Sequence, residues 1–423
     1  MSVFSDIVYQ QFVNCDDVSR NPLLTPIGTY SSTSSKKKMT DKFPTSWFLV
    51  ILIPFGLLIP HITDPCENES EDSDPPAQEL TAEMLPRFIN ISMNPCSDFY
   101  EFTCGIWKSE HPIGPCKSAI NQFHILGDKV AAKMRATFES PEVLQSKSAC
   151  TAKAIYRKCM DREELNRIGA KNMIREIREY SVSWPMLDRD KWRHERFNLT
   201  TLLIDALRKR GVQAFIRTDI ITDTKNATRA VIEFSQGFLR LGPHRDHYLD
   251  KEKYKEKIDA YQKVFVKLVK LIHEETNVSI DEKAIAYDVG KIFEFESKLA
   301  GITEAKEDLR NFTEMYNLRR LSDVGILMPL IDWNTYFHSV APSSIHKYLA
   351  ADPPVLLAQI DYMRRLTNLL NSTDSVTITN YVYTAYSLAL IDELGERYEG
   401  VAREFKYLTF GRKSKTPVER LLG

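Results

Sequence analysis

Two stretches of the sequence begin like a zinc-binding helix. An H-E-x-x-H motif places two imidazoles on one helix face, where they bind Zn²⁺, and its Glu activates a water molecule. The stretches that start at His194 and His273 both continue with Glu, but Asn198 and Asn277 stand where the second His is required. One His with flanking Glu side chains is a poor three-ligand zinc set. We therefore predict that neither stretch is a metal site.

His244 and His247 are a further pair at metal-binding spacing, with Asp246 between them. A third ligand adjacent in sequence would be strained, so a capping or solvent-exposed role is favoured for Asp246. Glu294 and Glu296 are two positions apart in a predicted helix and should face different directions. The sequence contains neither a G-x-S-x-G elbow nor a phosphate-binding Gly loop. We predict no catalytic residues, no metal ligands and no bound cofactor in this chain.

Cysteines are the other reactive residues, and six of them follow one another in one region: Cys66, Cys96, Cys104, Cys116, Cys150 and Cys159. An even number suggests disulfides if this region lies in an oxidising compartment. Two cysteines of one helix that are eight or nine residues apart are separated by about 12–13 Å, too far to bridge. This excludes Cys150 with Cys159, and Cys96 with Cys104 if they are also helical. Some of these cysteines therefore need partners that are distant in sequence.

An apolar stretch at residues 43–62 determines the predicted compartment. At about 1.5 Å per residue it just spans a hydrocarbon core of roughly 30 Å. Lys36–Lys38 and Lys42 precede it, whereas Cys66–Glu83 carries seven acidic residues and no Lys or Arg. The positive-inside rule then predicts a signal-anchor at the plasma membrane, single-pass type II, with an extracellular body. A signal peptide cleaved from a chain that starts at Met39, giving a secreted protein, and a buried core helix are alternatives.

All N-x-S/T acceptor sequences lie after this stretch. They start at Asn68, Asn90, Asn198, Asn226, Asn277, Asn311 and Asn371. Single acceptor sequences often arise by chance, but seven on one side of a signal-like segment favour a glycosylated extracellular body. Cys15 lies on the proposed cytoplasmic side and should be reduced.

Composition describes a normal globular protein of 423 residues, with 43% hydrophobic residues and a net charge of -1. This excludes wholesale disorder, and without a basic stripe nothing indicates a nucleic-acid partner. We divide the chain into a polar cytoplasmic tail (1–42), a transmembrane helix (43–62), an acidic stalk (63–93) and a globular body (94–423).

The body is predicted to be mainly α. Apolar residues recur every three or four positions in Tyr254–Ile272, Ile285–Leu299 and Val355–Leu370, which is typical of amphipathic helices. Val212–Ile221 and Ala230–Phe234 are β-branched and aromatic, and predict one small hairpin. The polar residues 222–228 between them should form its loop, which would then carry Asn226.

The stretch Asn94–Trp107, NPCSDFYEFTCGIW, resembles the entry to the ectodomain of the neprilysin/endothelin-converting-enzyme family of zinc metallopeptidases. That family's pattern is P-C-x-D-F-Y-x-[FY]-x-C-G-x-W. Further resemblances follow in unbroken order at Ala154–Cys159, Arg245–Leu249, Glu296–Ala300, Tyr316–Asn317, Pro329–Trp333, Asn380–Tyr381 and Phe410–Gly411. They extend over about Cys96 to Gly423.

The resemblance implies a type II membrane protein with a mainly helical, two-lobed ectodomain around a peptide-sized cavity. The family's zinc helix, its Glu ligand and its transition-state His lie beyond where this chain stops, so Zn belongs to full-length members only. The cysteines at the Cys96, Cys104 and Cys159 positions pair, in the family, with cysteines beyond Gly423. The pairing of Cys66, Cys116 and Cys150 stays open.

One departure from the family concerns Phe123–Gly127, where His124 and Gly127 replace the acidic residue and the Arg that serve the substrate cavity. This argues against the family's substrate contacts at these positions. The resemblance implies the N-terminal domain of a membrane-bound neprilysin-like zinc metalloendopeptidase that acts on extracellular peptides, and we predict that this chain is inactive alone. The alternative is a non-catalytic peptide-binding or decoy surface glycoprotein, and a merely structural surface glycoprotein is a third reading. The oligomeric state stays open.

Overall fold

A computed structural model of the chain describes residues 86–410, except 115, 116, 118, 143, 181, 243, 277 and 280. The predicted tail, the membrane segment and most of the stalk lie outside the described residues, as do Cys66, Cys116, Asn68 and Asn277. Over residues 86–410, no helix combines the length and the hydropathy that a membrane crossing requires. The chain divides into two compact units, Met1–His111 and Pro112–Gly423.

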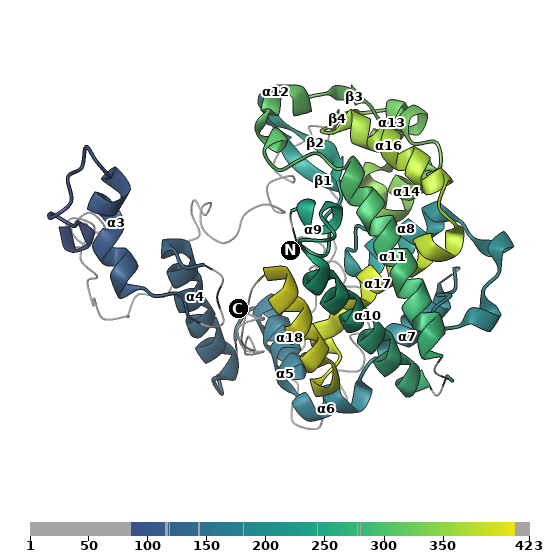
Figure 1. Ribbon diagram of the computed structural model, residues 1–423, viewed down its shortest axis with the longest axis horizontal. Helices are drawn as coiled ribbons and strands as arrows, with labels where there is room; N and C mark the ends of the chain where they lie inside the picture. Colours follow the sequence, from purple (N-terminus) through teal and green to yellow (C-terminus); the bar gives the residue numbers. More distant parts are fainter. Residues whose placement is uncertain are drawn as a thin grey trace, which may run out of the picture. The chain divides into compact units, whose positions relative to one another are not determined.

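The described part of the first unit is built around helix α3 (Phe99–Glu110) (Figure 1). Asp98 adopts an extended backbone and its side chain accepts from the Glu101 backbone N–H at 2.9 Å, which caps the helix. Cys104 therefore lies on α3, and Cys96 precedes its cap. The rings of Phe99 and Tyr100 are exposed.

Four helices open the second unit: α4 (Gln122–Glu139), α5 (Lys147–Met160), α6 (Arg162–Ile168) and α7 (Lys171–Glu179). Cys150 and Cys159 both lie on α5, which confirms the predicted helix and its geometric exclusion of a bond between them. Lys153 of α5 is buried, and its Nζ donates to the carbonyls of Ser140 at 2.6 Å and Glu142 at 2.8 Å. This amine fastens the C-terminal end of α4 to α5.

The remaining helices of this unit are α8 (Leu199–Arg210), α9 (Asp246–Leu249), α10 (Lys255–Thr276), α11 (Glu282–Ile302), α12 (Phe312–Met315), α13 (Leu321–Leu327), α14 (Trp333–Val340), α15 (His346–Ala350), α16 (Ile360–Asn371), α17 (Ser375–Leu390) and α18 (Glu396–Phe410). The predicted stripe of α10 is confirmed, because Ile258, Tyr261, Phe265, Leu268 and Ile272 are all buried. Both α11 and α18 pack against α10 (Figure 1).

Helix α17 lies inside the core and packs against α8 and α11. A buried tyrosine needs a partner for its hydroxyl. The hydroxyl of Tyr383 donates to the Val182 carbonyl at 2.5 Å, and that of Tyr381 to the Ala214 carbonyl at 3.2 Å. These bonds tie the segment after α7 and the segment before β1 to the central helix.

A four-stranded sheet accompanies the helices: β1 (Ile216–Asp223), β2 (Asn226–Gln236), β3 (Leu318–Arg320) and β4 (Pro354–Leu357). The strand order is β1-β2-β4-β3, with β2 and β4 parallel and the other pairs antiparallel. The mainly α class and the hairpin are confirmed, but two further strands extend the hairpin into a sheet. The helices and the sheet together position every feature described below.

The hairpin loop is shorter than its polar sequence predicts. Asp223 already pairs with Asn226, so Asn226 begins β2 instead of lying in a seven-residue loop. The Asp223 carboxylate is the reason: it accepts from the Lys225 backbone N–H at 2.9 Å, from the Tyr316 hydroxyl at 3.0 Å and from Arg229. Polar side chains on the two strand ends made this tight turn look like a loop.

The stripe predicted as one helix over Val355–Leu370 is a strand followed by a helix. Val355 pairs with Ile232 of β2 and with Arg319 of β3, and only from Ile360 does the chain become helical. A short buried apolar run is compatible with either structure, and partners distant in sequence decide between them. Pro354 fits as the first residue of a strand, because it has no N–H to donate.

Candidate functional site

The two stretches that begin like a zinc helix do not form a zinc site. His194 lies in a short 3₁₀ turn, His194–Arg196, and its Nδ1 is 2.9 Å from the Ser375 hydroxyl. Asn198 ends the stretch as the N-cap of α8, where its side chain accepts from the Thr201 N–H at 2.9 Å. The helix thus starts where the second ligand would have to be. A one-face arrangement of two ligands is therefore impossible here.

His273 lies on α10 but is turned into the core. Its Nε2 is 2.6 Å from the Met186 carbonyl oxygen, and the side chain is 5% exposed. The carboxylate of Glu275 accepts from the Ala170 backbone N–H at 2.7 Å. Nε2 of His273 and the Glu275 carboxylate are therefore occupied by structural hydrogen bonds to segments distant in sequence, while Nδ1 of His273 has no partner among the described residues.

In the pair His244 and His247, one ring is hydrogen-bonded to the backbone. The ring centroids of His244 and His247 are 5.9 Å apart, and His247 Nδ1 is 3.0 Å from the Leu241 carbonyl oxygen. Burial lowers the pKa of His247, and the charge of Lys257 lowers it further. Asp246 is exposed and makes no capping hydrogen bond, so of its two predicted roles the solvent-exposed one is correct.

Glu296 is the most buried carboxylate near these helices, and it too is structural. Its two oxygens accept from the Arg240 backbone N–H at 3.0 Å and the Tyr261 hydroxyl at 2.6 Å. Glu294 points to solvent with 59% of its side chain exposed, as the helical spacing predicted. Within the described part of the chain, no three His, Cys, Asp or Glu side chains are placed to hold a metal ion. The donors of the predicted motifs therefore do not fit zinc.

The four described cysteines make no disulfide with one another. Cys96 and Cys150 are exposed, and Cys104 and Cys159 are half-buried. Burial raises the pKa of the Cys159 thiol, and the charge of Glu393 raises it further. Such a thiol is protonated near neutral pH and is a poor nucleophile, so a structural role suits it better than a reactive one.

Most predicted glycosylation sites that the structure describes are accessible. Asn198, Asn226, Asn311 and Asn371 are exposed, and Asn90 is half-buried. In the turn at Asn226, the Oδ1 atom accepts from the hydroxyl of Thr228 at 2.7 Å. Asn198 and Asn311 also use Oδ1, as helix caps. Nδ2, the atom that would carry a glycan, takes no part in these bonds.

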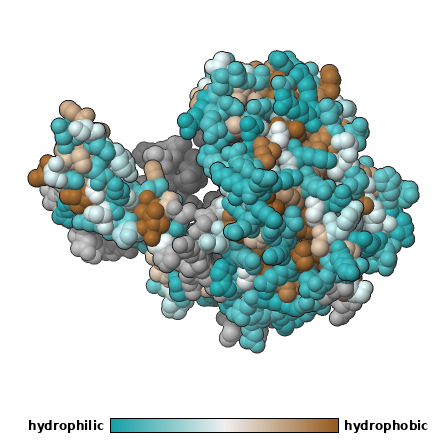
Figure 2. Space-filling view, viewed as in Figure 1, coloured by the Kyte–Doolittle hydropathy of each residue, from teal (hydrophilic) through white to brown (hydrophobic). Residues whose placement is uncertain are grey.

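Helix α4 carries an uncovered apolar face. Phe123, Leu126, Val130 and Met134 recur at helical spacing and are 83%, 58%, 48% and 39% exposed. No residue of α4 is buried. Figure 2 shows hydrophobic surface over the region that α4 occupies in Figure 1. An amphipathic helix normally buries such a stripe, so this face is a candidate docking surface.

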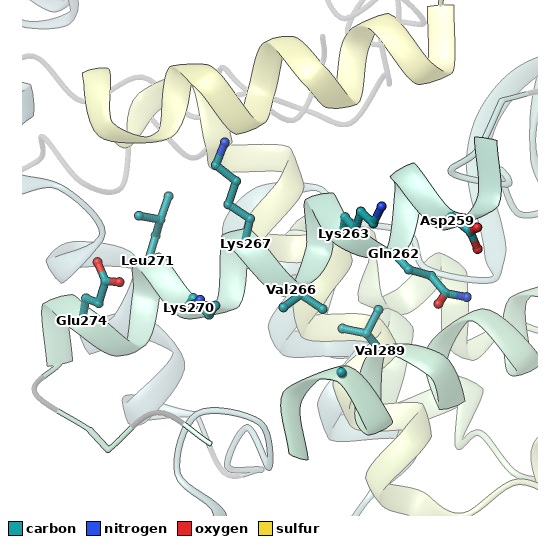
Figure 3. Close-up of a pocket in the computed structure, with 10 residues that line it drawn as sticks. Asp259, Gln262, Lys263, Val266, Lys267, Lys270, Leu271, Glu274 and Val289 are labelled. Atoms are coloured by element: carbon teal, nitrogen blue, oxygen red, sulfur yellow. The ribbon is translucent and has the colours of Figure 1, made fainter. Parts of the chain in front are cut away.

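Two hollows mark the second unit. The first, of about 590 Å³, is a groove along α10, with Ala286 and Val289 of α11 at one side (Figure 3). Two of its three lysines are paired with acids: Lys270 Nζ is 2.5 Å from Glu282 and Lys267 Nζ is 3.9 Å from Glu404. We interpret this groove as ordinary charged helix surface.

The second hollow, of about 490 Å³, lies where β2 ends and is lined by Glu233, Ser235 and Phe238 among others. Sequence reasoning missed these residues. The sequence carried no signal for them, because strand alternation predicts burial of only one of the adjacent residues Phe234 and Ser235, whereas the structure buries both.

Comparisons with known proteins cover almost all of the described chain. The family model described as peptidase family M13 matches residues 95–421. Neprilysin-1 of Caenorhabditis elegans is 35% identical over 346 residues, which are 81% of this chain and 46% of that protein. Neprilysin-11 of the same organism is 30% identical over 361 residues, covering 85% of this chain and 42% of that protein.

A solved structure shares the fold. The zinc metalloprotease Zmp1 of Mycobacterium tuberculosis, in complex with an inhibitor, matches with a TM-score of 0.62 and 19% identity. The match covers 79% of this chain and 48% of that chain. This chain therefore spans less than half the length of the relatives it matches.

Proposed function

The chain belongs to peptidase family M13, and from this premise we propose that it is the N-terminal domain of a membrane-bound, neprilysin-like zinc metalloendopeptidase that cleaves extracellular peptides. In this proposal the chain holds no zinc and is inactive alone. The zinc ligands and catalytic groups belong to the part of the family protein that the relatives have in addition to the matched region.

The observation that carries this proposal is the uncovered apolar face of α4. Burying one such side chain completely contributes about 1.5–3 kcal/mol, so four of them form a substantial docking surface. The C-terminal end of α4 is fastened to α5 by Lys153 and by Tyr156, whose hydroxyl donates to Glu139 at 2.9 Å and whose ring packs against Phe138. A second lobe packed on the stripe would complete the burial of this helix. His194, His273 and Glu296 are each engaged in a hydrogen bond within the fold. This supports the second part of the proposal, that catalysis needs residues from outside this chain.

The topology belongs to the same proposal. We propose that residues 43–62 anchor the protein in the plasma membrane, that the body is extracellular, and that residues 94–423 form one family domain. Cys96, Cys104 and Cys159 then pair with cysteines of the additional part, and the seven acceptor asparagines are available for glycans. The exposure of Asn198, Asn226, Asn311 and Asn371 supports this. Enzymatic removal of N-glycans from the protein expressed through the secretory pathway, followed by peptide mass spectrometry, identifies which asparagines carry glycans.

Activity is tested on the purified full chain. We expect less than stoichiometric zinc by elemental analysis and no chelator-sensitive cleavage of a fluorogenic neprilysin-type peptide. A neprilysin purified and assayed in parallel is the positive control. Stoichiometric zinc with chelator-sensitive cleavage would refute the proposal. Tight binding of the same peptide without cleavage would instead favour the decoy function.

A further inference from the structure

The hollow at the end of β2 has the size of a ligand site. Its volume is about 490 Å³, within the usual range of roughly 300–1,000 Å³ for small-molecule pockets. Its walls come from β1 and β2, the segment 236–239, the residues around the start of α9, the loop 303–309 after α11, and residues 358–359 before α16. Leu309, Met315 and Ala358 supply apolar surface.

Hydrogen bonds hold these walls together. The Gln236 side chain accepts from the Glu304 backbone N–H at 2.8 Å and donates to the Glu304 carbonyl at 3.3 Å. The Gln359 side chain accepts from the Gln236 N–H at 2.9 Å, and Arg245 donates to the Thr303 carbonyl at 2.8 Å. The loop after α11 is thus tied to strand and helix on two sides. A cavity with fixed walls loses little entropy when a ligand binds.

Two polar groups of the cavity have no hydrogen-bond partner among the described residues. Ser235 is 9% exposed, and its hydroxyl makes no hydrogen bond within the described part of the chain. A buried unsatisfied hydroxyl costs about 1–3 kcal/mol, so it needs an explanation. Glu233 is half-buried, and no described residue donates a hydrogen bond to its carboxylate. Burial raises the pKa of Glu233, and the charge of Asp219 adds to this against the opposing charge of Arg217.

The charge of the lining favours a cation. Four acidic residues, Glu233, Asp246, Glu304 and Glu307, face three permanently basic ones, Arg217, Arg245 and Lys306. The guanidinium of Arg217 is already paired with Asp219, which lies outside the cavity lining. An anionic ligand would be repelled by these carboxylates, and a neutral one would leave Glu233 with only the charge of Arg217, which is shared with Asp219.

An exposed aromatic ring completes the rim. Phe238 is 70% exposed, and the Arg217 guanidinium lies over its ring, 4.4 Å from the centroid. Exposed rings of this kind bind cations and the methylene stems of long basic side chains. The rim therefore offers an apolar contact beside an unpaired carboxylate.

We propose that this cavity binds the basic side chain of a peptide from solution, with Glu233 pairing with its cation. The Ser235 hydroxyl hydrogen-bonds a polar group of the bound segment, and Phe238 covers the stem of the side chain. The inference does not rest on the proposed function, since its ligand binds without zinc and without cleavage.

The test compares two probes of nearly equal shape on the full chain. Nα-acetyl-arginine amide carries the cation, and Nα-acetyl-citrulline amide is its neutral counterpart. Titration by calorimetry or ligand-observed NMR should show that the arginine amide binds about tenfold tighter than the citrulline amide, because one charge-assisted hydrogen bond contributes a free energy of that size. Equal affinity for the two probes would overturn the proposal.

Variants locate the site. Glu233→Gln should remove the preference for arginine amide, and Phe238→Ala, at an exposed position, should weaken binding of both probes. Glu294→Gln, an exposed carboxylate of α11 outside the cavity, should change nothing. A preference that survives Glu233→Gln, in a variant whose circular dichroism matches the parent, contradicts the proposal. So does binding that Phe238→Ala leaves unchanged.

Discussion

Replacing Lys153 by Met should weaken the docking of α4 on α5 while leaving the core intact. The amine is buried and donates to two carbonyls beyond the end of α4, at 2.6 and 2.8 Å, with two further oxygens at 3.5 Å. Methionine keeps most of the side-chain volume but donates no hydrogen bond. The carbonyls of Ser140, which is half-buried, and of Glu142 would then lose this partner.

The expected cost follows from these bonds. A hydrogen bond to a charged group contributes about 1.5–3 kcal/mol, and a cation near a helix C-terminus adds about 0.3–1 kcal/mol. The burial of the ammonium group offsets part of this gain. We expect a net loss of about 3 kcal/mol in the docking of α4, which corresponds to a roughly 100-fold change in its opening equilibrium.

Hydrogen exchange followed by mass spectrometry measures this directly. In Lys153→Met, peptides from α4 should exchange up to about 100-fold faster, because none of its side chains is buried and the other contacts with α5 that the structure describes are the Tyr156–Glu139 hydrogen bond and the Phe138–Tyr156 ring contact. Peptides from α10 should exchange as in the parent chain. Lys147→Met, at the exposed start of α5, is the matched control. Unchanged exchange of α4, or equal acceleration of α4 and α10, would refute the reasoning.

Three further predictions concern stability. Gly237→Ala should destabilise the fold by about 1–3 kcal/mol in urea unfolding, since its Cβ would lie 2.8 Å from the backbone of Phe215. Gly290→Ala, whose Cβ would have no neighbour within 4 Å, should be neutral or stabilising. Leu126→Glu should leave the free energy of unfolding of this chain unchanged within about 0.5 kcal/mol while reducing its self-association. A large loss of stability would mean that α4 is covered in solution. Asp188 pairs with Arg178 at 2.8 Å, and although burial opposes it, this bond lowers the pKa of Asp188. Its folded pKa is thus below the unfolded value of about 3.9, so the stabilisation exists above pH 4 and is lost as pH falls through the folded value. In urea unfolding, the midpoint of Asp188→Asn should be lower than that of the parent at pH 7 and similar to it at acid pH.

Local patterns in the sequence were sufficient for the long helices. The stripe of α10 needs only the helical period, and Ile258, Tyr261 and Leu268 are buried as that period requires. The hairpin was also predictable, because β-branched and aromatic residues gather on both of its strands. The incompleteness of the zinc motif was also evident from the sequence, since the absence of a second histidine is a property of the sequence alone.

Other features depended on residues far apart in the chain. Val355–Leu357 became a strand because β2 and β3 offer free hydrogen-bonding edges to it, although its apolar pattern fits a helix. The turn before Asn226 tightened because Tyr316 and Arg229 bind the Asp223 carboxylate.

The sequence by itself determined the family, the helical period and the lack of a complete zinc motif, because each is carried by spacing along one stretch of chain. The tertiary structure alone decided which polar groups are satisfied. His273 and Glu296 look like potential ligands until Met186, Arg240 and Tyr261 are placed beside them. The Ser235 hydroxyl has no signal in the sequence until the fold buries it without a hydrogen-bond partner among the described residues, beside the half-buried Glu233. Hydrogen bonding acts over about 3 Å in space whatever the separation in sequence, so periodicity cannot predict it.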